Sequence, residues 1–420
     1  MAGNSLHVNA ARLQENLEEL AKIGRNESGG IDRQLASPAD SEARAWLKNL
    51  WEKIGLGIRT DAIANLWGKP RSGAAEGRPI VLGSHHDTVP NGGAYDGALG
   101  VLMATEVVQT LIEGGAELRH PVWTLSMTGE EPSDFSVSTL GSKVLCGRLV
   151  EKDLEQIRNR VTGEKLETAI ERLGGDIHRV AEDALLEKGR LAAFIECHIE
   201  QGRRLYDAGE NIAAVTCITG IYREILYVHG EANHAGTTQL HDRRDALAAA
   251  SDIVLAVEDL MREAPDLAAT VGHIQAQPNA SNIVPAQVML TLDLRTANPE
   301  TRAAALEHFG EAVRGIEQAR GVVIERKLNL DQAEMPMDGD VVRAIGDAAE
   351  ALGEPRRELV SMAGHDAANL ARLTKAGMIF VSTVSGYSHC PQEAAPEKAV
   401  AVAAQAMLET VLLLDRRLPI

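Results

Sequence analysis

The chain of 420 residues has few aromatic side chains, at 3%, and only four cysteines, none of them in a CxxC pair. Cysteines scattered in this way argue against a disulfide framework and indicate a reducing compartment. No apolar stretch approaches the ~20 residues that a membrane-spanning helix needs. The first residues show no basic segment followed by an apolar run. We therefore expect a cytoplasmic protein with no membrane partner.

The chain also has fewer basic than acidic residues: it has 42 lysines and arginines and 60 aspartates and glutamates, which gives a net charge of -18. This balance argues against nucleic acid as a partner, since the phosphate backbone is bound by basic surfaces. A small anionic substrate is still compatible with it, because charges inside a cleft outweigh the global field. A length of 420 residues exceeds one ordinary core, so we expect two domains.

The order of apolar runs predicts an α/β fold made of a catalytic domain and an inserted α+β domain. Helical periodicity predicts helices within 8–58, the second of them at 37–54, and further helices at 100–111, 340–352 and 396–414. Short apolar runs predict strands at 62–68, 79–84, 122–127 and 376–381. Between them, strands at 222–229, 270–275, 288–295 and 321–328 and helices at 242–261 and 299–318 give the order βαββαβ, as in a ferredoxin-like sandwich. We place the catalytic domain at 1–213 and 331–420 and the inserted domain at 214–330.

The first candidate site follows the strand predicted at 79–84. His85 comes at its end and Asp87 two residues later, so both side chains point the same way if the chain stays extended. We expect His85 to bind a metal ion and Asp87 to orient its imidazole. Asp96 lies in a glycine-rich loop before a helix, where one carboxylate can bridge two cations.

A second acidic pair, Glu130-Glu131, follows the strand predicted at 122–127. Adjacent residues of an extended chain face opposite ways, so we expect Glu131 to bind metal and Glu130 to move a proton. His198 and His389 follow later apolar runs and complete a set of three imidazoles and two carboxylates. That set satisfies two divalent ions at four to five ligands each, which is the inventory of a two-metal hydrolase.

The inserted domain carries polar groups near the ends of its predicted strands. His234 lies in a glycine- and threonine-rich loop, Asn282 precedes a strand and Arg295 ends one. Such groups suit an oxyanion, a carbonyl and a carboxylate of a substrate. From the pattern alone they could equally be surface positions.

Four segments together carry a resemblance to the hydantoinase/carbamoylase branch of the M20 metallopeptidase family. They are Gly83-Ser-His-His-Asp-Thr-Val-Pro-Asn-Gly-Gly-Ala-Tyr-Asp-Gly-Ala-Leu-Gly-Val, Glu196-Cys-His-Ile-Glu-Gln-Gly, Gly230-Glu-Ala-Asn-His-Ala-Gly-Thr-Thr and Gly364-His-Asp-Ala. The resemblance runs from about residue 8 to the end. The branch includes N-carbamoyl-L-amino acid amidohydrolases, allantoate and ureidoglycolate amidohydrolases and β-alanine synthases.

The resemblance implies a role for each candidate. His85, Asp96 and His198 would hold one ion and Asp96, Glu131 and His389 the other, with zinc, manganese, cobalt or nickel as the metal. Glu130 would be the general base. Gln201, Asn282, Arg295 and Gly364 would contact the substrate, with Arg295 on its carboxylate. His234 would stabilise the oxyanion from the partner chain of a homodimer formed through the inserted domain.

The chain departs from the branch pattern at several positions near the expected site. His86 stands where a leucine-like residue is usual, Asp134 replaces a base, Met362 replaces a glycine and Tyr387 precedes the last histidine motif. Met362 adds bulk and removes backbone freedom near the substrate. None is an expected metal ligand, so these changes bear on the substrate and not on the reaction class.

We therefore expect a hydrolase that cleaves the ureido amide bond of an N-carbamoyl-L-amino acid or a related ureido acid, giving amino acid, carbon dioxide and ammonia. Alternatives are an allantoate or ureidoglycolate amidohydrolase, or an N-acyl-amino acid hydrolase or dipeptidase with the same metals and base. A non-catalytic binding protein is a further alternative, against which the intact ligand set and Glu130 argue.

Overall fold

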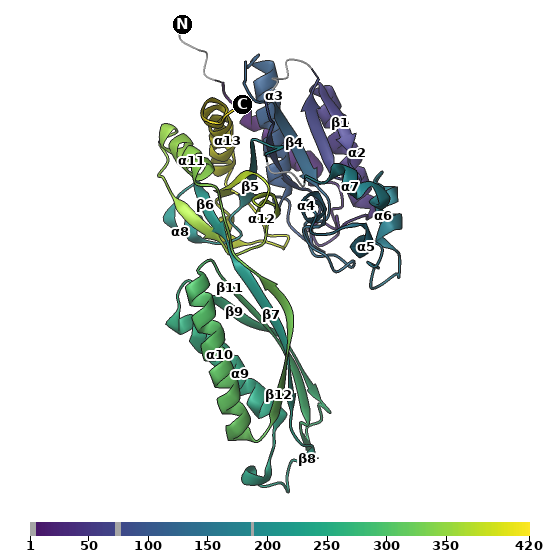
Figure 1. Cartoon of the computed structure of the whole chain (residues 1–420), viewed down its shortest axis with the longest axis vertical. Coiled ribbons are helices and arrows are strands. Elements are labelled where there is room, and N and C mark those ends of the chain that lie inside the picture. The colour runs from purple at the N-terminus through teal and green to yellow at the C-terminus, as the bar shows by residue number, and fades with distance from the viewer. Residues whose placement is uncertain (1–5, 72–76, 186–188) are drawn as a thin grey trace. The chain divides into compact units, whose positions relative to one another are not determined.

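The computed structural model describes residues 6–71, 77–185 and 189–420, which form two compact units (Figure 1). The first unit comprises Met1–Thr216 and Pro336–Ile420, and the second is the inserted segment Cys217–Met335. The sequence placed the inserted segment at 214–330. No helix among the described residues is both long and apolar enough to cross a membrane.

The first unit is built on a nine-stranded mixed sheet of order β1-β2-β4-β3-β5-β15-β6-β13, with β14 paired to β6. Its central strands β4, β3, β5 and β15 are parallel, so their carboxyl ends meet at one edge. The strands are β1 (Leu56–Thr60), β2 (Leu66–Pro70), β3 (Ile80–His85), β4 (Val122–Met127), β5 (Ala193–Ile199), β6 (Ile212–Ile218), β13 (Met335–Pro336), β14 (Glu358–Ser361) and β15 (Lys375–Val381).

Helices pack against this sheet and against one another. α3 contacts β3, β4 and β5, while α11 and α13 contact β15 and each other. The long helices are α1 (Ala10–Leu20), α2 (Pro38–Lys53), α3 (Ala98–Glu113), α11 (Gly339–Ala351) and α13 (Glu397–Arg417). The short ones are α4 (Leu140–Leu145), α5 (Glu151–Leu154), α6 (Leu166–Arg172), α7 (Val180–Asp183), α8 (Arg204–Ala208) and α12 (Ala367–Leu370). Ser37 caps α2 by accepting a hydrogen bond from the Asp40 amide, and Pro38 starts the helix.

The second unit is a four-stranded antiparallel sheet of order β12-β7-β11-β9 with two helices. Its elements are β7 (Gly220–His229), α9 (Ala246–Glu263), β9 (Ala268–Gln277), β11 (Gln287–Thr296), α10 (Pro299–Arg320) and β12 (Val323–Gln332). The short strands β8 (Asn233–His234) and β10 (Ile283–Val284) pair with each other. This is the βαββαβ order that the sequence predicts, so the expected α/β fold class with a ferredoxin-like insertion is confirmed.

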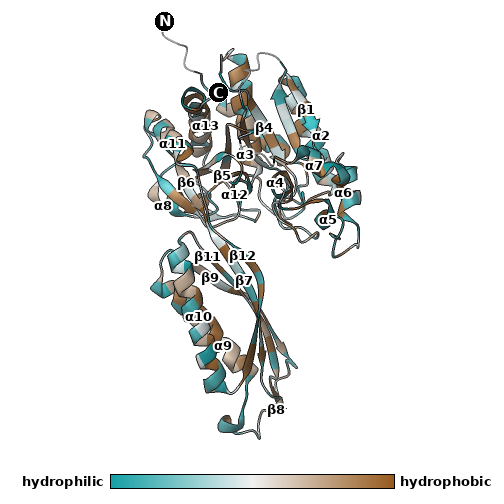
Figure 2. Ribbon diagram, in the orientation of Figure 1, coloured by the Kyte–Doolittle hydropathy of each residue, from teal (hydrophilic) through white to brown (hydrophobic). Residues whose placement is uncertain are grey.

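Alternation of apolar and polar residues explains how the second unit closes its core. On β11, Val288, Leu290, Leu292 and Leu294 are at most 1% exposed and join a cluster with residues of α9 and α10. Residues between them are partly exposed on the other face of the sheet. Figure 2 shows that α9 and α10 each carry both hydrophobic and hydrophilic residues.

Two expectations about local structure are wrong. The strand expected from residue 62 begins only at Leu66, because Asp61 accepts a hydrogen bond from the Asn65 amide and closes a turn with Ala64 at a φ of 68°. The helix expected from residue 242 begins at Ala246, where the Asp245 side chain caps it.

Candidate metal centre

The expected metal-binding residues of the first unit lie at the carboxyl edge of the parallel strands. His85 ends β3 and His198 is the penultimate residue of β5, while Glu130 and Glu131 follow β4 and His389 lies in the loop after β15. Asp96 lies just before α3. Because parallel strands bring these termini together, residues that are far apart in sequence become neighbours.

The first group consists of two imidazoles and one carboxylate, all buried. Asp96 Oδ1 lies 3.4 Å from His85 Nε2 and 3.2 Å from His198 Nε2. The candidate ligand atoms of these three residues all lie within 4.8 Å of one another. Such a set of two nitrogens and one oxygen suits a zinc-like divalent ion.

The second group shares Asp96 with the first. Its other oxygen, Oδ2, lies 3.4 Å from His389 Nε2, and Glu131 Oε1 lies 3.1 Å from that same nitrogen. His389 is 47% exposed, whereas Asp96 and Glu131 are buried. One carboxylate therefore presents one oxygen to each group, as a carboxylate that bridges two ions does.

Hydrogen bonds on the far side of two imidazoles fix which nitrogen faces the cluster. His85 Nδ1 lies 3.1 Å from the carbonyl oxygen of Asp87, and His198 Nδ1 lies 2.9 Å from that of Ile199. Because a carbonyl only accepts, each Nδ1 carries a proton and Nε2 is the nitrogen that faces Asp96. Burial lowers the pKa of His85 and of His198, but the neighbouring carboxylates outweigh it and raise both, so a cation in place of an Nε2 proton would be favoured there.

The buried atoms of the site fit a cation better than they fit one another. His85 Nε2 is buried and has no hydrogen-bond partner, although Asp96 and Glu130 oxygens lie 3.4 and 3.7 Å away. Hydrogen bonds to Asp96 and Glu131 raise the pKa of His389 to about 11. Carboxylates that hold a proton on an imidazole so strongly favour a positive charge at that place, and a divalent ion supplies it. The residues present therefore fit bound metal.

Asp87 acts on both sides of the site through its main chain and its carboxylate. Its carboxylate oxygens accept hydrogen bonds from the amides of Glu130 and Glu131, at 3.2 and 3.1 Å. The nearest carboxylate oxygen lies 3.6 Å from His85 Nδ1, so the closer partner of that imidazole is the Asp87 carbonyl. Asp87 thus fixes the turn after β4 as well as His85.

Glu130 belongs to neither metal group but lies beside the first. Burial raises the pKa of the Glu130 carboxyl well above its ordinary value, and although His85 opposes the rise, the charge of Glu131 adds to it. A raised pKa near metal-binding groups is typical of a carboxyl that accepts and returns a proton.

Two further candidates of the first unit lie near these groups. Gln201 Nε2 donates to Asp96 Oδ2 at 2.7 Å, and Gln201 Oε1 is buried without a partner. A side chain built at Gly364 would meet nothing within 4 Å, so this residue borders open space. The next residue, His365, stacks edge-on against His198 with ring centres 4.5 Å apart.

The three candidates of the second unit lie in two places: His234 and Asn282 at the two-stranded sheet of β8 and β10, and Arg295 on the four-stranded sheet. His234 on β8 pairs with Ile283, and the Asn282 carbonyl accepts a hydrogen bond from the Ala235 amide. Arg295 lies near the end of β11, where its guanidinium donates twice to Asp293, at 2.7 and 3.1 Å. The first residue of β11, Gln287, and Arg295 are about 27 Å apart at the usual rise of a strand.

The departures from the family pattern have different surroundings. His86 is fully buried and does not face the metal groups, because Nε2 lies 2.8 Å from Asp40 Oδ1 and Nδ1 2.6 Å from Ser126 Oγ. Asp134 and Tyr387 are exposed, and Met362 is partly buried.

Several supporting residues were not anticipated. Glu393 accepts hydrogen bonds from the amides of Tyr95, Asp96 and His389. Glu196 accepts from Ser84 and the Ala367 amide beneath the site. The only sequence signal for Glu393 is its position four residues after His389. This signal is weak, because an acid at that spacing from a ligand forms no distinctive motif.

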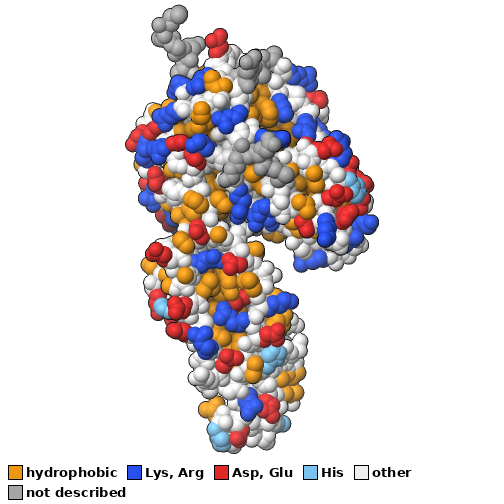
Figure 3. All heavy atoms as spheres, in the orientation of Figure 1, with side chains coloured by type: hydrophobic (Ala, Val, Ile, Leu, Met, Phe, Trp, Pro, Cys, Tyr) orange, Lys and Arg blue, Asp and Glu red, His pale blue; other side chains and the backbone are white. Residues whose placement is uncertain are grey.

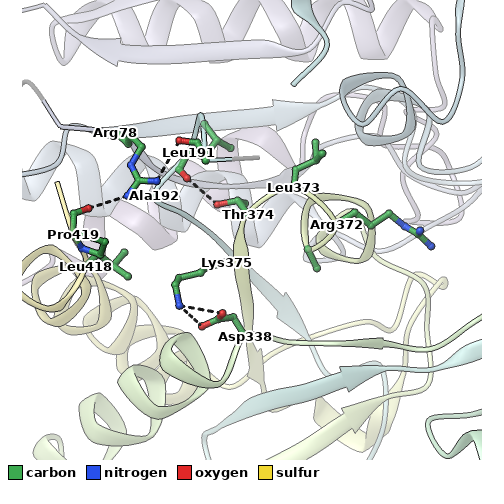
Figure 4. A pocket seen from close by; sticks show the side chains of 12 residues that line it. Arg78, Leu191, Ala192, Asp338, Arg372, Leu373, Thr374, Lys375, Leu418 and Pro419 are labelled. Atoms are coloured by element: carbon green, nitrogen blue, oxygen red, sulfur yellow. Dashed lines mark hydrogen bonds and ion pairs between the residues drawn. The ribbon is translucent and has the colours of Figure 1, made fainter. Parts of the chain in front are cut away.

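A cavity of about 300 Å³ elsewhere in the first unit is a different feature (Figure 4). It is lined by residues such as Ala192 and Lys375 at the amino ends of β5 and β15, away from the edge that carries the imidazoles. Arg78 donates to the carbonyls of Gly189 and Pro419, and Lys375 lies 3.3 Å from Asp338. These pairings satisfy Arg78 and Lys375, and no expected site residue lines the cavity.

Comparison with known proteins gives consistent matches over nearly the whole chain. Residues 81–413 match the model of peptidase family M20/M25/M40. An N-carbamoyl-L-amino acid amidohydrolase of Geobacillus stearothermophilus is 33% identical over 96% of this chain and 98% of its own length. An allantoate amidohydrolase of Bacillus subtilis is 33% identical over 94% and 95%. A crystal structure of a hydantoinase/carbamoylase family amidase from Burkholderia multivorans has a TM-score of 0.89 at 31% identity, covering 97% of this chain and 98% of that one.

Proposed function

The chain belongs to the M20/M25/M40 peptidase family, and we propose that it is a hydrolase that cleaves the ureido C–N bond of an N-carbamoyl-L-amino acid or a related ureido acid. The observation that carries the proposal is the convergence of three imidazoles and two carboxylates on one edge of the sheet, with Glu130 beside them. Relatives named for N-carbamoyl amino acids, allantoate and ureidoglycolate support the ureido class of substrate.

Two divalent ions fit the two groups, with Asp96 shared between them. His85 and His198 would complete one group, and Glu131 and His389 the other. Zinc, manganese, cobalt or nickel suits donor sets of imidazole and carboxylate. Such ions, when bound, would supply Lewis acidity that polarises the ureido carbonyl and lowers the pKa of water.

Glu130 would move the proton. As a carboxylate with a raised pKa, it can take a proton from the attacking water and return it to the leaving nitrogen. One water is consumed: the terminal NH₂ leaves as ammonia, the ureido carbon leaves as carbon dioxide, and the other ureido nitrogen remains as the amine of the amino acid. The Asp87 carboxylate keeps Glu130 in place, because it holds the amides of both Glu130 and Glu131.

Other residues would orient the substrate. Gln201 lies against Asp96 and has a buried oxygen without a partner, which a donor such as the terminal NH₂ of a ureido group would satisfy. The open space at Gly364 leaves room for substrate near His365. Arg295 would bind the carboxylate, since a guanidinium recognises it through paired hydrogen bonds.

We further propose a homodimer formed through the second unit, with His234 and Asn282 serving the site of the partner chain. The length of β11 supports this: His234 follows β7 five residues after His229, which pairs with Gln287 at the start of β11, whereas Arg295 lies near the other end of β11. The unit also leaves apolar surface for an interface: Leu255 on α9 is 57% exposed and Ile274 on the edge strand β9 is 47% exposed.

Figure 3 shows hydrophobic side chains among the charged ones on the visible face of this unit. Sedimentation of wild type and Leu255→Asp tests it: a monomeric wild type would refute the dimer.

The reaction is tested by measuring ammonia and free amine together. Metal-loaded protein is given N-carbamoyl, N-acetyl and dipeptide forms of the same amino acids, with Glu130→Gln as the control. Ammonia and amine released in equal amounts support the ureido reaction. Amine released without ammonia would refute it in favour of an acylase or peptidase.

A further inference from the structure

Glu393 connects the two loops that carry Asp96 and His389. Its Oε1 accepts hydrogen bonds from the amides of Tyr95 and Asp96, at 2.8 and 2.9 Å, and its Oε2 accepts one from the His389 amide at 3.2 Å. We infer that Glu393 is a positioning residue of the metal centre, which holds the main chain of these two loops so that Asp96 and His389 face each other. The inference rests on the proposed metal centre.

Both loops need such a connection because neither has regular structure at the residue in question. Asp96 lies between β3 and α3, and His389 has a φ of 58°, in the left-handed region that non-glycine residues rarely adopt. Strand pairing fixes β3 and β15 but ends before these residues. A single carboxylate with hydrogen bonds to both loops sets their separation where the sheet cannot.

The space around Glu393 is shaped to admit its side chain. A Cβ atom at Gly93 would lie 2.1 Å from both Cδ and Oε1 of Glu393, so only glycine fits at this position. Glu393 is 5% exposed, and the three amides satisfy both of its carboxylate oxygens. Burial and the charge of Asp96 raise the pKa of Glu393 to about 7, and the three amide hydrogen bonds oppose this rise because they favour the charged carboxylate.

Glu393 also acts without contributing a ligand atom. Its carboxylate contacts the main chain of Asp96 and His389, and the candidate ligand groups of the described residues do not include it. If Glu393 positions these loops, Glu393→Gln should weaken metal binding less than Glu393→Ala does. In Glu393→Gln the amide oxygen can still accept from Tyr95 and Asp96, but its NH₂ group would face the His389 amide, donor against donor.

The experiment compares zinc binding by wild type, Glu393→Gln and Glu393→Ala, using metal-free protein and calorimetric titration. We expect wild type to bind two ions. Glu393→Gln should weaken mainly the ion held by His389, by ~10-fold or more, which corresponds to losing a hydrogen bond to a charged group. Glu393→Ala releases both loops and should weaken both ions.

A matched control is Asp32→Asn. Asp32 accepts a hydrogen bond from the Asn91 amide at 2.7 Å, in the same loop that carries Asp96, but it contacts no expected ligand residue. Zinc affinities of this variant should equal those of wild type. Hydrogen exchange in metal-free protein gives a second readout: the amides of Tyr95, Asp96 and His389 should exchange faster in Glu393→Ala and not in Asp32→Asn.

The outcomes separate this inference from the proposed function. A wild type that binds fewer than two zinc ions refutes the proposed metal centre itself. A wild type that binds two ions while Glu393→Gln binds them with unchanged affinity refutes the positioning role alone, even if the variant unfolds at a lower temperature. If Glu393→Ala does not fold, the zinc affinities of Glu393→Gln and the exchange rate of its His389 amide still test the positioning role.

Discussion

Removing the Asp40 carboxylate should destabilise the first unit strongly. Asp40 is fully buried, and its Oδ1 lies 2.7 Å from Arg44 Nε and 2.8 Å from His86 Nε2, while Oδ2 accepts from the Ala36 amide. Arg44 also donates to Thr128 at the end of β4. The cluster thus joins α2 to the strand ends that carry His85 and Glu130.

The magnitude follows from the burial of both charges. Arg44 and Asp40 side chains are 4% and 0% exposed, so Asp40→Ala would leave a guanidinium charge buried without its partner. Breaking a buried pair from one side costs about 3–5 kcal/mol. An exposed pair with the same spacing, Arg203 and Asp207 at 64% and 53% exposed, provides the control. Asp207→Ala should cost about 0–1 kcal/mol at most.

Tryptophan fluorescence during urea unfolding reports the stability of the first unit, which contains Asp40. All four tryptophans, Trp46, Trp51, Trp67 and Trp123, belong to the first unit. Asp40→Ala should shift the midpoint to lower urea, and the double variant Asp40→Ala/Arg44→Met should regain part of the loss because no charge is then left buried. A loss from Asp40→Ala no larger than that from Asp207→Ala would refute the reasoning.

The pH dependence gives a further check on the same cluster. Burial by itself would raise the pKa of Asp40, but Arg44 and His86 outweigh it and hold that pKa well below its ordinary value. The contribution of ionised Asp40 to the free energy of unfolding is therefore fully present above the unfolded pKa of 3.8, and it is lost only as the pH falls below that value. Burial lowers the pKa of His86, which is then neutral at pH 7. The cost of Asp40→Ala should be the same at pH 7 and 8, and a cost that falls between them would mean that charged His86 carries the interaction.

Three further changes test the proposed chemistry. Glu130→Gln should keep its bound metal and lose at least ~10²-fold in kcat, measured by ammonia release, and unchanged turnover would contradict the role of Glu130 as base. Arg295→Ala should raise KM for a ureido acid by ~10-fold or more with a smaller change in kcat, and an unchanged KM would exclude Arg295 from carboxylate binding. Chelation should lower the unfolding temperature followed by tryptophan fluorescence, since an ion at 100 times its dissociation constant adds ~2.7 kcal/mol to the folded state, and zinc should restore it.

Periodic elements could be predicted from the sequence because their pattern repeats. The alternation of β11 gives its buried face directly, and the order of elements in the second unit gives its sandwich. Strands β1 and β14 are not predicted, because they are short and have few buried residues. Strand β6 is also not predicted, although most of its residues are buried. The turn at Asp61 was missed since a side-chain hydrogen bond, and not hydropathy, ends the strand there.

Candidate ligands could be found because imidazoles and carboxylates at strand ends are uncommon and chemically distinctive. Supporting residues could not, since Asp40, Glu196 and Glu393 are ordinary acids in the sequence and gain meaning only through contacts across 46, 112 and 297 residues. His86 could be noted as unusual, but only the structure shows that it serves Asp40 and Ser126 and not the metal groups.

The position of His389 far along the chain is explained by strand order. β15 lies parallel to β5 with Phe380 opposite His198 and Val381 opposite Ile199, so the loop after β15 starts beside the loop after β5. The insertion of 217–335 lengthens the chain between these strands without changing which strands are neighbours. The strand register does not determine the conformation of the loop from Val381 to His389. At the end of this loop, the His389 amide donates a hydrogen bond to Glu393. Strand pairing therefore places the site, and buried carboxylates define its final geometry.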